Sequence, residues 1–141
     1  MLGLLAERLG CQFGALWMVQ GEEGVLACAA TWRTGSVAQA FEAMSRRWRF
    51  SIGVGLPGRV WSSGEPAWLF DFVEESSFPR AAVARREGLH GAVAFPVHRD
   101  DTVLGVVELL SEQRRDPDPA LLAAVAAVGR HLALHLERRC P

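Results

Sequence analysis

The feature that most constrains the fold is a short polar turn between two apolar segments, a pattern that occurs twice. The first pair spans residues 11–20 and 24–33, and the second spans 91–97 and 102–110. Such pairs are typical of β-hairpins. A hairpin joins antiparallel strands, whereas parallel strands need a crossover of a dozen or more residues. We therefore expect an antiparallel sheet with helices packed on it.

The last predicted strand, TVLGVVELL, is apolar on both faces except for one carboxylate, Glu108. A sheet with one solvent-exposed face has strands that alternate between apolar and polar residues. This strand does not alternate in that way, so we expect both faces of the sheet to be covered. Helices at the two ends of the chain, MLGLLAERL and residues 117–139, would cover one face. Short helices near 57–63 and 79–87 would roof the other. The predicted fold class is α+β, with a central antiparallel sheet of five to six strands.

Local signals predict where several elements begin. Ser36 and Gln39 have the spacing of a capping box before an amphipathic helix. Asp116 or Asp118 is expected to cap the last helix, because a proline suited to the first helical position follows each of them. These signals leave open which aspartate is used.

The segment PAWLFDF alternates in a way that predicts a further strand. Trp68, Phe70 and Phe72 would point to one face of the sheet, and Leu69 and Asp71 to the other. Both faces of this strand would then carry apolar residues, which again indicates a sheet covered on both sides.

Composition indicates one soluble domain, residues 1–141. The chain is half apolar, which suits a single core. Its net charge of −1 gives no electrostatic reason to bind nucleic acid or an anionic membrane. We expect a cytoplasmic protein, because no apolar run is long enough for a membrane span and the start lacks a secretory signal. All 15 basic residues are arginine, which indicates GC-rich codons and a bacterial source.

The three cysteines, Cys11, Cys28 and Cys140, form no CxxC motif. If the first hairpin turns near Glu22, Cys28 lies opposite Leu16 and not opposite Cys11. A disulfide within the chain is therefore not expected, and free thiols are the simpler interpretation.

Three segments in order resemble the GAF domain family, and the resemblance covers residues 2–139. They are GVGLPGRVWSSGEPAWLFD, FPRAAVARREGLHGAVAFPV and VLGVVELLSEQRRDPDPALLAAVAAVGRHLALHLERR. The similarity is to GAF modules of bacterial multidomain sensors, such as histidine kinases and cyclic-dinucleotide synthases. The family implies a GAF/PAS-like sheet with a ligand cavity between one face and the shorter helices. It also implies a regulatory function, in which a bound small molecule alters a neighbouring domain.

On that resemblance, the ligand pocket is expected around residues 56–89. Small-molecule sites are concave and mostly apolar, with a few polar groups that fix orientation. The expected apolar walls are Trp61, Trp68, Phe70 and Phe78. The expected polar groups are Asp71, Arg80, His90 and Glu108. A carboxylate inside an apolar strand needs a partner or water, so the alternative for Glu108 is a pair with an arginine near a strand end.

Departures from known GAF subfamilies limit the cofactor and the chemistry. No cysteine precedes a histidine, so covalent bilin is not expected. Ser111 and Glu112 stand where the cyclic-nucleotide-binding subset has an Asn-Lys pair. His90 leaves noncovalent haem open as an alternative, and the cysteines leave open a redox enzyme of the methionine sulfoxide reductase type. The ligand itself is unknown at this stage.

Metal and catalytic motifs are weak. His131 and His135 are four residues apart on the last helix, but no third ligand is evident, so we interpret them as helix-surface residues and expect no metal. The chain has no G-x-S-x-G and no G-x-x-x-x-G-K motif. We expect a regulatory domain and not an enzyme.

The last helix carries two apolar stripes, although one is enough to pack on its own sheet. Gly129, in the second stripe, would allow the backbone of a partner to approach closely. We therefore predict a homodimer that pairs through the first and last helices in a parallel bundle. The expected interface residues are Leu5, Leu121, Val125, Val128 and Leu132. The alternative is one wide face buried entirely within the monomer.

Two hypotheses for function follow. The first is a sensory module that binds a small molecule and acts through its terminal helices on an output domain, such as a histidine kinase or diguanylate cyclase. The second is a structural homodimerisation domain whose pocket is filled by its own side chains. A chamber with room for a guest would favour the first hypothesis, and a packed interior would favour the second.

Overall fold

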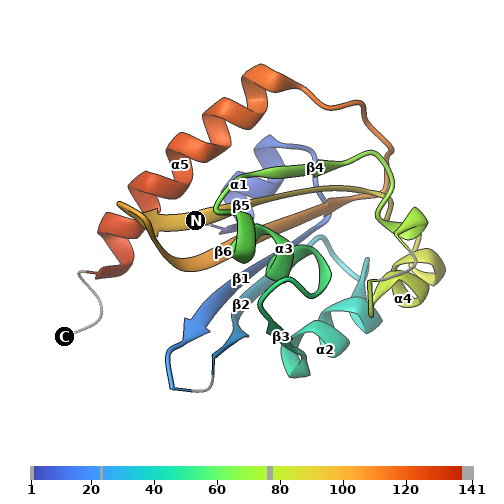
Figure 1. Cartoon of the computed structure of the whole chain (residues 1–141). Coiled ribbons are helices and arrows are strands. Elements are labelled where there is room, and N and C mark those ends of the chain that lie inside the picture. The colour runs from blue at the N-terminus through green and yellow to red at the C-terminus, as the bar shows by residue number, and fades with distance from the viewer. Residues whose placement is uncertain (1, 23, 76–77, 138–141) are drawn as a thin grey trace.

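The computed structural model describes residues 2–22, 24–75 and 78–137 (Figure 1). In chain order the elements are α1 (Leu2–Arg8), β1 (Phe13–Gln20), β2 (Val25–Arg33), α2 (Gln39–Arg47), β3 (Arg49–Ser51), α3 (Gly55–Ser63), β4 (Ala67–Leu69), η1 (Phe72–Glu74), α4 (Ala81–Arg86), β5 (Gly91–Arg99), β6 (Thr102–Ser111) and α5 (Pro119–Glu137). The element η1 is a single turn of 3₁₀ helix.

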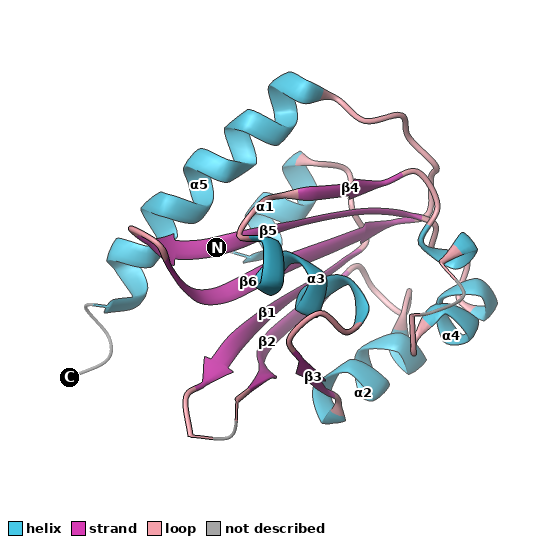
Figure 2. Ribbon diagram, viewed as in Figure 1, coloured by secondary structure: helices cyan, strands magenta, loops and turns pink. Residues whose placement is uncertain are grey.

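The strands form one antiparallel sheet, and both predicted hairpins are confirmed (Figure 2). The strand order is β3-β2-β1-β6-β5-β4. The hairpins β1–β2 and β5–β6 meet at the centre, where β1 pairs with β6. The α+β fold class predicted from the two hairpins is therefore correct.

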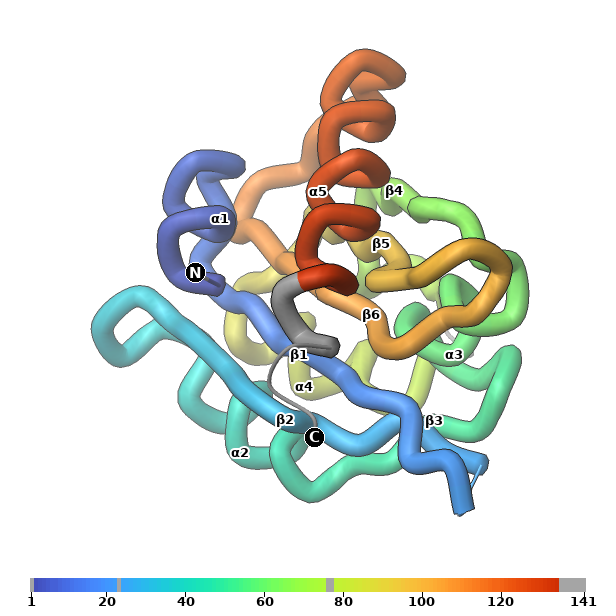
Figure 3. Tube along the Cα trace, turned by 90° about the vertical axis from the view of Figure 1, so that its left-hand side faces the viewer, coloured from blue at the N-terminus to red at the C-terminus, as the bar shows by residue number. Residues whose placement is uncertain are grey.

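Helices cover both faces of the sheet (Figure 3). This was predicted from strands that are apolar on both faces. The terminal helices α1 and α5 lie on one side, which we call the helix face. The short helices α2, α3 and α4 lie on the other side, which we call the lid face. On β5 the residues alternate between them. Ala92 and Ala94 belong to the lid-face core, and Val93, Phe95 and Val97 belong to the helix-face core.

The longest helix, α5, begins as one of the two aspartate alternatives predicts. Asp118 Oδ1 accepts hydrogen bonds from the backbone N–H groups of Ala120 and Leu121, at 3.1 and 3.2 Å. Pro119 is the first helical residue. Among the described residues, no helix combines the length and the apolar character that crossing a bilayer demands.

Three local predictions are wrong. The capping box is absent, because a turn at residues 34–37 leads to Ala38 in the left-handed region, with a φ of 64° and no side-chain cap. Cys28 pairs with Trp17 and not with Leu16, because the pairing register differs by one residue from the one expected for a turn at Glu22. The strand predicted from PAWLFDF ends at Leu69, so Phe70 and Phe72 do not continue its alternation.

Candidate functional site

The centre of the lid face is built on β6, where Glu108 is fully buried. Its direct cross-strand neighbours are Ala15 on β1 and Ala94 on β5, and both are also fully buried. Two methyl groups beside a carboxylate leave room above the sheet. A buried carboxylate requires hydrogen bonds or a counter-charge, so this room must hold a polar partner.

Arg80 supplies that partner from the lid. Its guanidinium Nη2 lies 2.5 Å from Glu108 Oε2, and its Nη1 donates to Ser45 Oγ at 2.8 Å. The second carboxylate oxygen of Glu108 accepts a hydrogen bond from Trp17 Nε1 at 3.1 Å. Arg80 is 1% exposed, so this is a fully buried ion pair. Glu108 therefore pairs with an arginine, as one of the sequence alternatives proposed, but in the middle of the sheet.

Aromatic rings surround the Arg80 guanidinium. Its Cζ atom lies 4.7 Å from the ring centre of Phe41, 5.0 Å from Phe50, 5.4 Å from Trp17 and 5.7 Å from Phe72. The π-faces of such rings attract cations within about 6 Å. We call this group of side chains the Arg80 cage. It consists of Trp17, Phe41, Ser45, Phe50, Phe72 and Glu108.

Local structure explains why Arg80 points inward. It stands at the N-cap of α4, directly after Pro79, and the following turn buries Ala81 and Ala84 against the core. The short helix ends at Arg86, and Gly88 follows with a φ of 75° that reverses the chain, so that Leu89 N–H donates to the carbonyl of Ala84. The space that the resemblance assigned to a ligand is thus filled by an arginine of the lid.

A second polar cluster lies at the edge of the lid, around Asp71. Its Oδ1 accepts from the backbone N–H of Val73 at 3.1 Å, which caps η1, and lies 3.0 Å from His90 Nδ1. Its Oδ2 accepts from Arg114 Nε at 2.6 Å. The cluster connects the segment after β4 to the residue just before β5 and to the chain that follows β6.

The ionisation of Asp71 follows from these contacts. Burial alone would raise the pKa of its carboxyl group, but hydrogen bonds from Arg114, His90 and the Val73 backbone outweigh burial and hold the pKa below its ordinary value. Asp71 therefore carries a negative charge at neutral pH. It joins three segments of the chain through charged hydrogen bonds.

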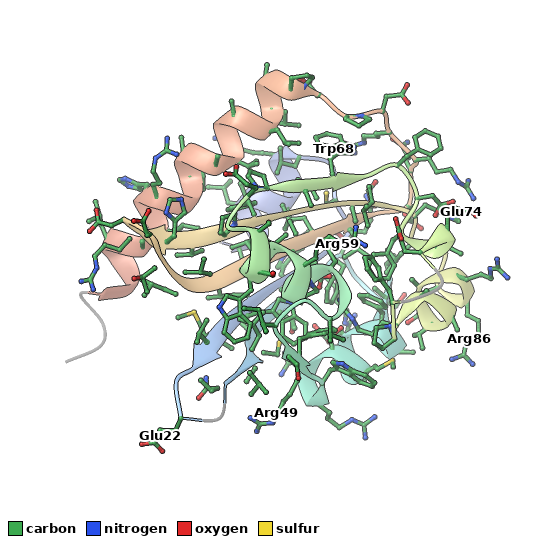
Figure 4. The ribbon with its side chains drawn as sticks, viewed as in Figure 1. Glu22, Arg49, Arg59, Trp68, Glu74 and Arg86 are labelled. Carbon is green, nitrogen blue, oxygen red and sulfur yellow. The ribbon has the colours of Figure 1, made fainter. Side chains whose placement is uncertain are left out.

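The remaining predicted wall residues separate into three environments. Phe78 is 5% exposed in the lid-face core, and Trp61 packs against that core from α3. Trp68 lies on the helix face, where its Nε1 donates to the Arg115 carbonyl at 3.0 Å (Figure 4). Phe70 is 49% exposed. The predicted common face for Trp68, Phe70 and Phe72 is wrong, because the strand ends at Leu69.

The residues predicted for a dimer interface pack within the monomer. Leu5, Val125, Val128 and Leu132 contribute to the helix-face core, and Leu121 lines a shallow pocket with Leu9 and Cys11. The argument from Gly129 is corrected. A Cβ atom there would overlap the carbonyl oxygen of Pro96 on β5, so this glycine serves the chain's own sheet. Val125 from the first stripe and Gly129 from the second therefore both lie against the chain's own sheet.

Cysteine and histidine placement bears on the redox and metal alternatives. Cys11 lies on the helix face and Cys28 beside the lid-face core, and both are free. Burial raises the pKa of the Cys11 thiol to about 11, and burial also raises that of Cys28, so neither is a ready thiolate. Cys140 and the side chain of His135 lie outside the described residues. His131 is exposed on α5, and no set of three metal-ligating groups occurs in the described part of the chain.

Arg80 and Glu108 were predicted for the site, but the other residues of the cage were not. Of these, four lie before residue 56, where the predicted pocket begins: Trp17, Phe41, Ser45 and Phe50. A usable signal exists in the strands. Alanines at matching positions on both neighbours of a buried glutamate indicate a partner that comes from outside the sheet.

The fold and the layered arrangement define a GAF domain. The GAF domain family matches residues 1–137, nearly the whole chain, and the chain belongs to this family. GAF domains are generally regulatory sensory domains in signalling proteins.

Solved structures share the fold at low sequence identity. A GAF domain of a phosphoenolpyruvate-protein phosphotransferase from Coxiella burnetii aligns with a TM-score of 0.79 and 20% identity, over 97% of this chain and 78% of that chain. The free methionine-R-sulfoxide reductase of Neisseria meningitidis, solved with its substrate, aligns with a TM-score of 0.75 and 16% identity, over 96% and 73%. These identities establish the fold alone.

A curated relative matches in sequence. Protein NLP2 of Oryza sativa subsp. japonica is 29% identical over 133 residues, which cover 83% of this chain and 14% of that protein. For this relative and the other curated plant proteins that match, the chain spans between 7% and 14% of the relative's length.

Proposed function

We propose that this GAF domain is a sensory module that binds a small molecule on its lid face and passes the change through its terminal helices in a dimer. The observation that carries the proposal is the buried Arg80–Glu108 pair inside an aromatic cage. A buried ion pair is a weak source of stability, because desolvation offsets the attraction. An apolar filling of the same space would hold the lid at least as well, so the polar site favours a binding role.

Family membership supports the regulatory part of the proposal. GAF neighbours occur in larger signalling proteins, one of them joined to an HD domain in Geobacter sulfurreducens. We place this module in a cytoplasmic bacterial protein of two-component or similar type. Its output domain would be a histidine kinase or a diguanylate cyclase.

A thermal-shift screen of metabolites tests the ligand-binding part. A compound that binds only the folded state raises the melting temperature, and the rise grows with the logarithm of its concentration once that concentration exceeds Kd. The shift should shrink in Trp61→Ala if the ligand reaches α3, and should persist in the exposed control Glu65→Gln. If no compound of any charge class stabilises the protein, and native mass spectrometry finds no retained ligand, sensing at this face is refuted.

The second candidate is a structural dimerisation domain. The filled space above Glu108 favours it, since Arg80 leaves the lid face packed by the chain itself. This alternative expects a dimer and no ligand, so the same screen separates the two candidates.

Dimerisation is best supported by the outer side of α5. Ala124, Ala127, His131 and Leu134 are exposed, and they follow one another at spacings of 3, 4 and 3, as in the seam of a helix pair. Leu134 is 59% exposed. We expect Leu134→Glu to convert a dimer to a monomer in analytical ultracentrifugation. Ile52→Glu, an equally exposed aliphatic residue near β3, should leave the dimer intact. A dimer that survives Leu134→Glu would exclude this seam.

A further inference from the structure

We propose that the Arg80 cage is a cation site, and that the ligand is a small molecule with a guanidinium or amidinium group that binds in place of the Arg80 side chain. The inference rests on the proposed sensory function and names its ligand class. In the structure described above, Arg80 acts as the intramolecular occupant of the site. It holds the lid closed when the ligand is absent.

The chemistry of the cage matches a planar cation. Four ring centres lie within 5.7 Å of the guanidinium carbon, and three of the rings are phenylalanines that offer only π-faces. Two hydrogen-bond acceptors lie at the edge of the guanidinium, Glu108 on the sheet and Ser45 on α2. A flat group with N–H donors along its edge fits both sets of contacts. A spherical ammonium ion would use the rings but not both acceptors.

The floor of the cage is built into the sheet independently of Arg80. Glu108 is held on β6 between β1 and β5, and the indole of Trp17 fixes its second oxygen. The alanines at positions 15 and 94 keep the space above the carboxylate open. Removal of the Arg80 side chain would therefore leave a preformed, negatively charged recess.

Arg80 can leave the cage more easily than Glu108 can, and we infer the charge of the ligand from this difference. Glu108 lies on a central strand and cannot reach water without disruption of the sheet. Arg80 stands at the N-cap of a six-residue surface helix, and its guanidinium can move into solvent with that segment. An anionic ligand would have to separate Arg80 from Glu108 and leave a carboxylate buried without a partner. A cationic ligand replaces the charge that departs.

Arg80 itself satisfies the site incompletely. Its Nε is buried without a hydrogen-bond partner among the described residues. The side chain enters from α4, so its stem directs Nε away from both acceptors of the cage. A free guanidinium compound is not tethered to α4, so it can adopt the orientation that makes the best hydrogen bonds to Glu108 and Ser45. The site is thus suited to competition between Arg80 and a diffusible cation.

Methylguanidine is the probe that tests the inference, with calorimetric titration and thermal shift as the readouts. We expect saturable binding to the wild-type domain, and at least tenfold tighter binding to Arg80→Ala, because the internal competitor is removed. Arg85→Ala removes the same charge from an exposed position of α4 and should bind like the wild type. Tetramethylammonium, which lacks N–H donors, should bind at least tenfold more weakly, and sodium chloride controls for ionic strength.

The outcomes separate this inference from the function on which it rests. Binding to Arg80→Ala that is lost in Arg80→Ala/Glu108→Gln would support the cage as the site. Should Arg80→Ala fail to fold by circular dichroism, Arg80→Met and the wild-type titration decide. Binding to Arg80→Ala without any binding to the wild type would overturn the ligand assignment and leave Arg80 as a structural filling. An anionic or neutral ligand found in the metabolite screen, with no response to methylguanidine, would refute the cation site while the sensory function stands.

Discussion

The two faces of the sheet are built by different rules, although the same strands supply both. On β5 the helix face presents Val93, Phe95 and Val97, whereas the lid face presents Ala92 and Ala94. Large aliphatic and aromatic side chains fill the space under α5 directly from the sheet. The small side chains lie at the centre of the lid face, where Ala15, Ala92 and Ala94 leave space that residues from the lid must fill.

The difference indicates which face is built to change. On the helix face the backbone of α5 approaches β5 so closely that only glycine fits at position 129, and no side chain there can leave without a cavity. On the lid face the central space is filled by one long side chain whose charged end arrives from the surface. The closest backbone contact thus lies under α5, whereas the charged contacts at the centre of the lid face depend on a single side chain that could be exchanged.

The largest expected effect comes from a break in the buried pair. Glu108→Ala removes the only counter-charge that the described residues place against Arg80, and should lower the free energy of unfolding by about 3–5 kcal/mol. Arg80→Met/Glu108→Leu removes both charges and should recover most of that loss. Urea denaturation of the three proteins checks this. A double variant no more stable than Glu108→Ala would mean that the ion pair itself stabilises the lid and is not exchangeable.

The next effect tests the rigidity of the helix face. Gly129→Ala would place a methyl group against the Pro96 carbonyl, and should cost about 2–3 kcal/mol as α5 is pushed away from β5. Ala123→Val, at an exposed position of the same helix, should cost less than about 0.7 kcal/mol. Thermal melts of both variants provide the measurement. Equal losses would show that α5 can shift on the sheet and that the helix face is not the rigid one.

A smaller effect on stability, which depends on pH, is expected at Asp71 on the edge of the lid. The pKa of Asp71 is lowered in the folded state, so its contribution is fully present above its unfolded pKa of about 4 and is lost as the pH falls toward the folded value. Asp71→Asn should lower stability by about 1.5 kcal/mol at pH 7. The gap between wild type and variant should narrow near pH 3 in urea titrations. A gap of constant size would mean that the charge of Asp71 is not what joins these segments.

The smallest effect is expected at Phe70. Its side chain is half exposed beyond the end of β4, so Phe70→Ser should change the free energy of unfolding by less than about 0.5 kcal/mol. It should also leave methylguanidine affinity unchanged, because Phe70 is not part of the cage. A loss of affinity in this variant would extend the site to the outer edge of the lid.

Much of the architecture was predictable from local patterns. The hairpins, the last helix and the short lid helix closed by Gly88 follow from periodicity and turn chemistry, which act over a few residues. Errors arose where one residue of register or one strand end decided the outcome, as at Cys28 and Phe70. The alternation of side chains predicts which face of the sheet a residue occupies only as long as the strand continues. After the strand ends, the later side chains no longer follow that pattern.

The sequence by itself determined that this chain forms a sheet covered on both sides, because its strands are apolar on both faces and its hairpins are local. Only the tertiary structure decided what lies at the centre of the lid face. Arg80, Ser45, Trp17 and Glu108 come from α4, α2, β1 and β6, and no local pattern relates them. These four side chains come together only because the strand register places alanines beside Glu108 and because α4 packs where its Arg80 side chain reaches the sheet. Those are properties of packing, not of any one segment.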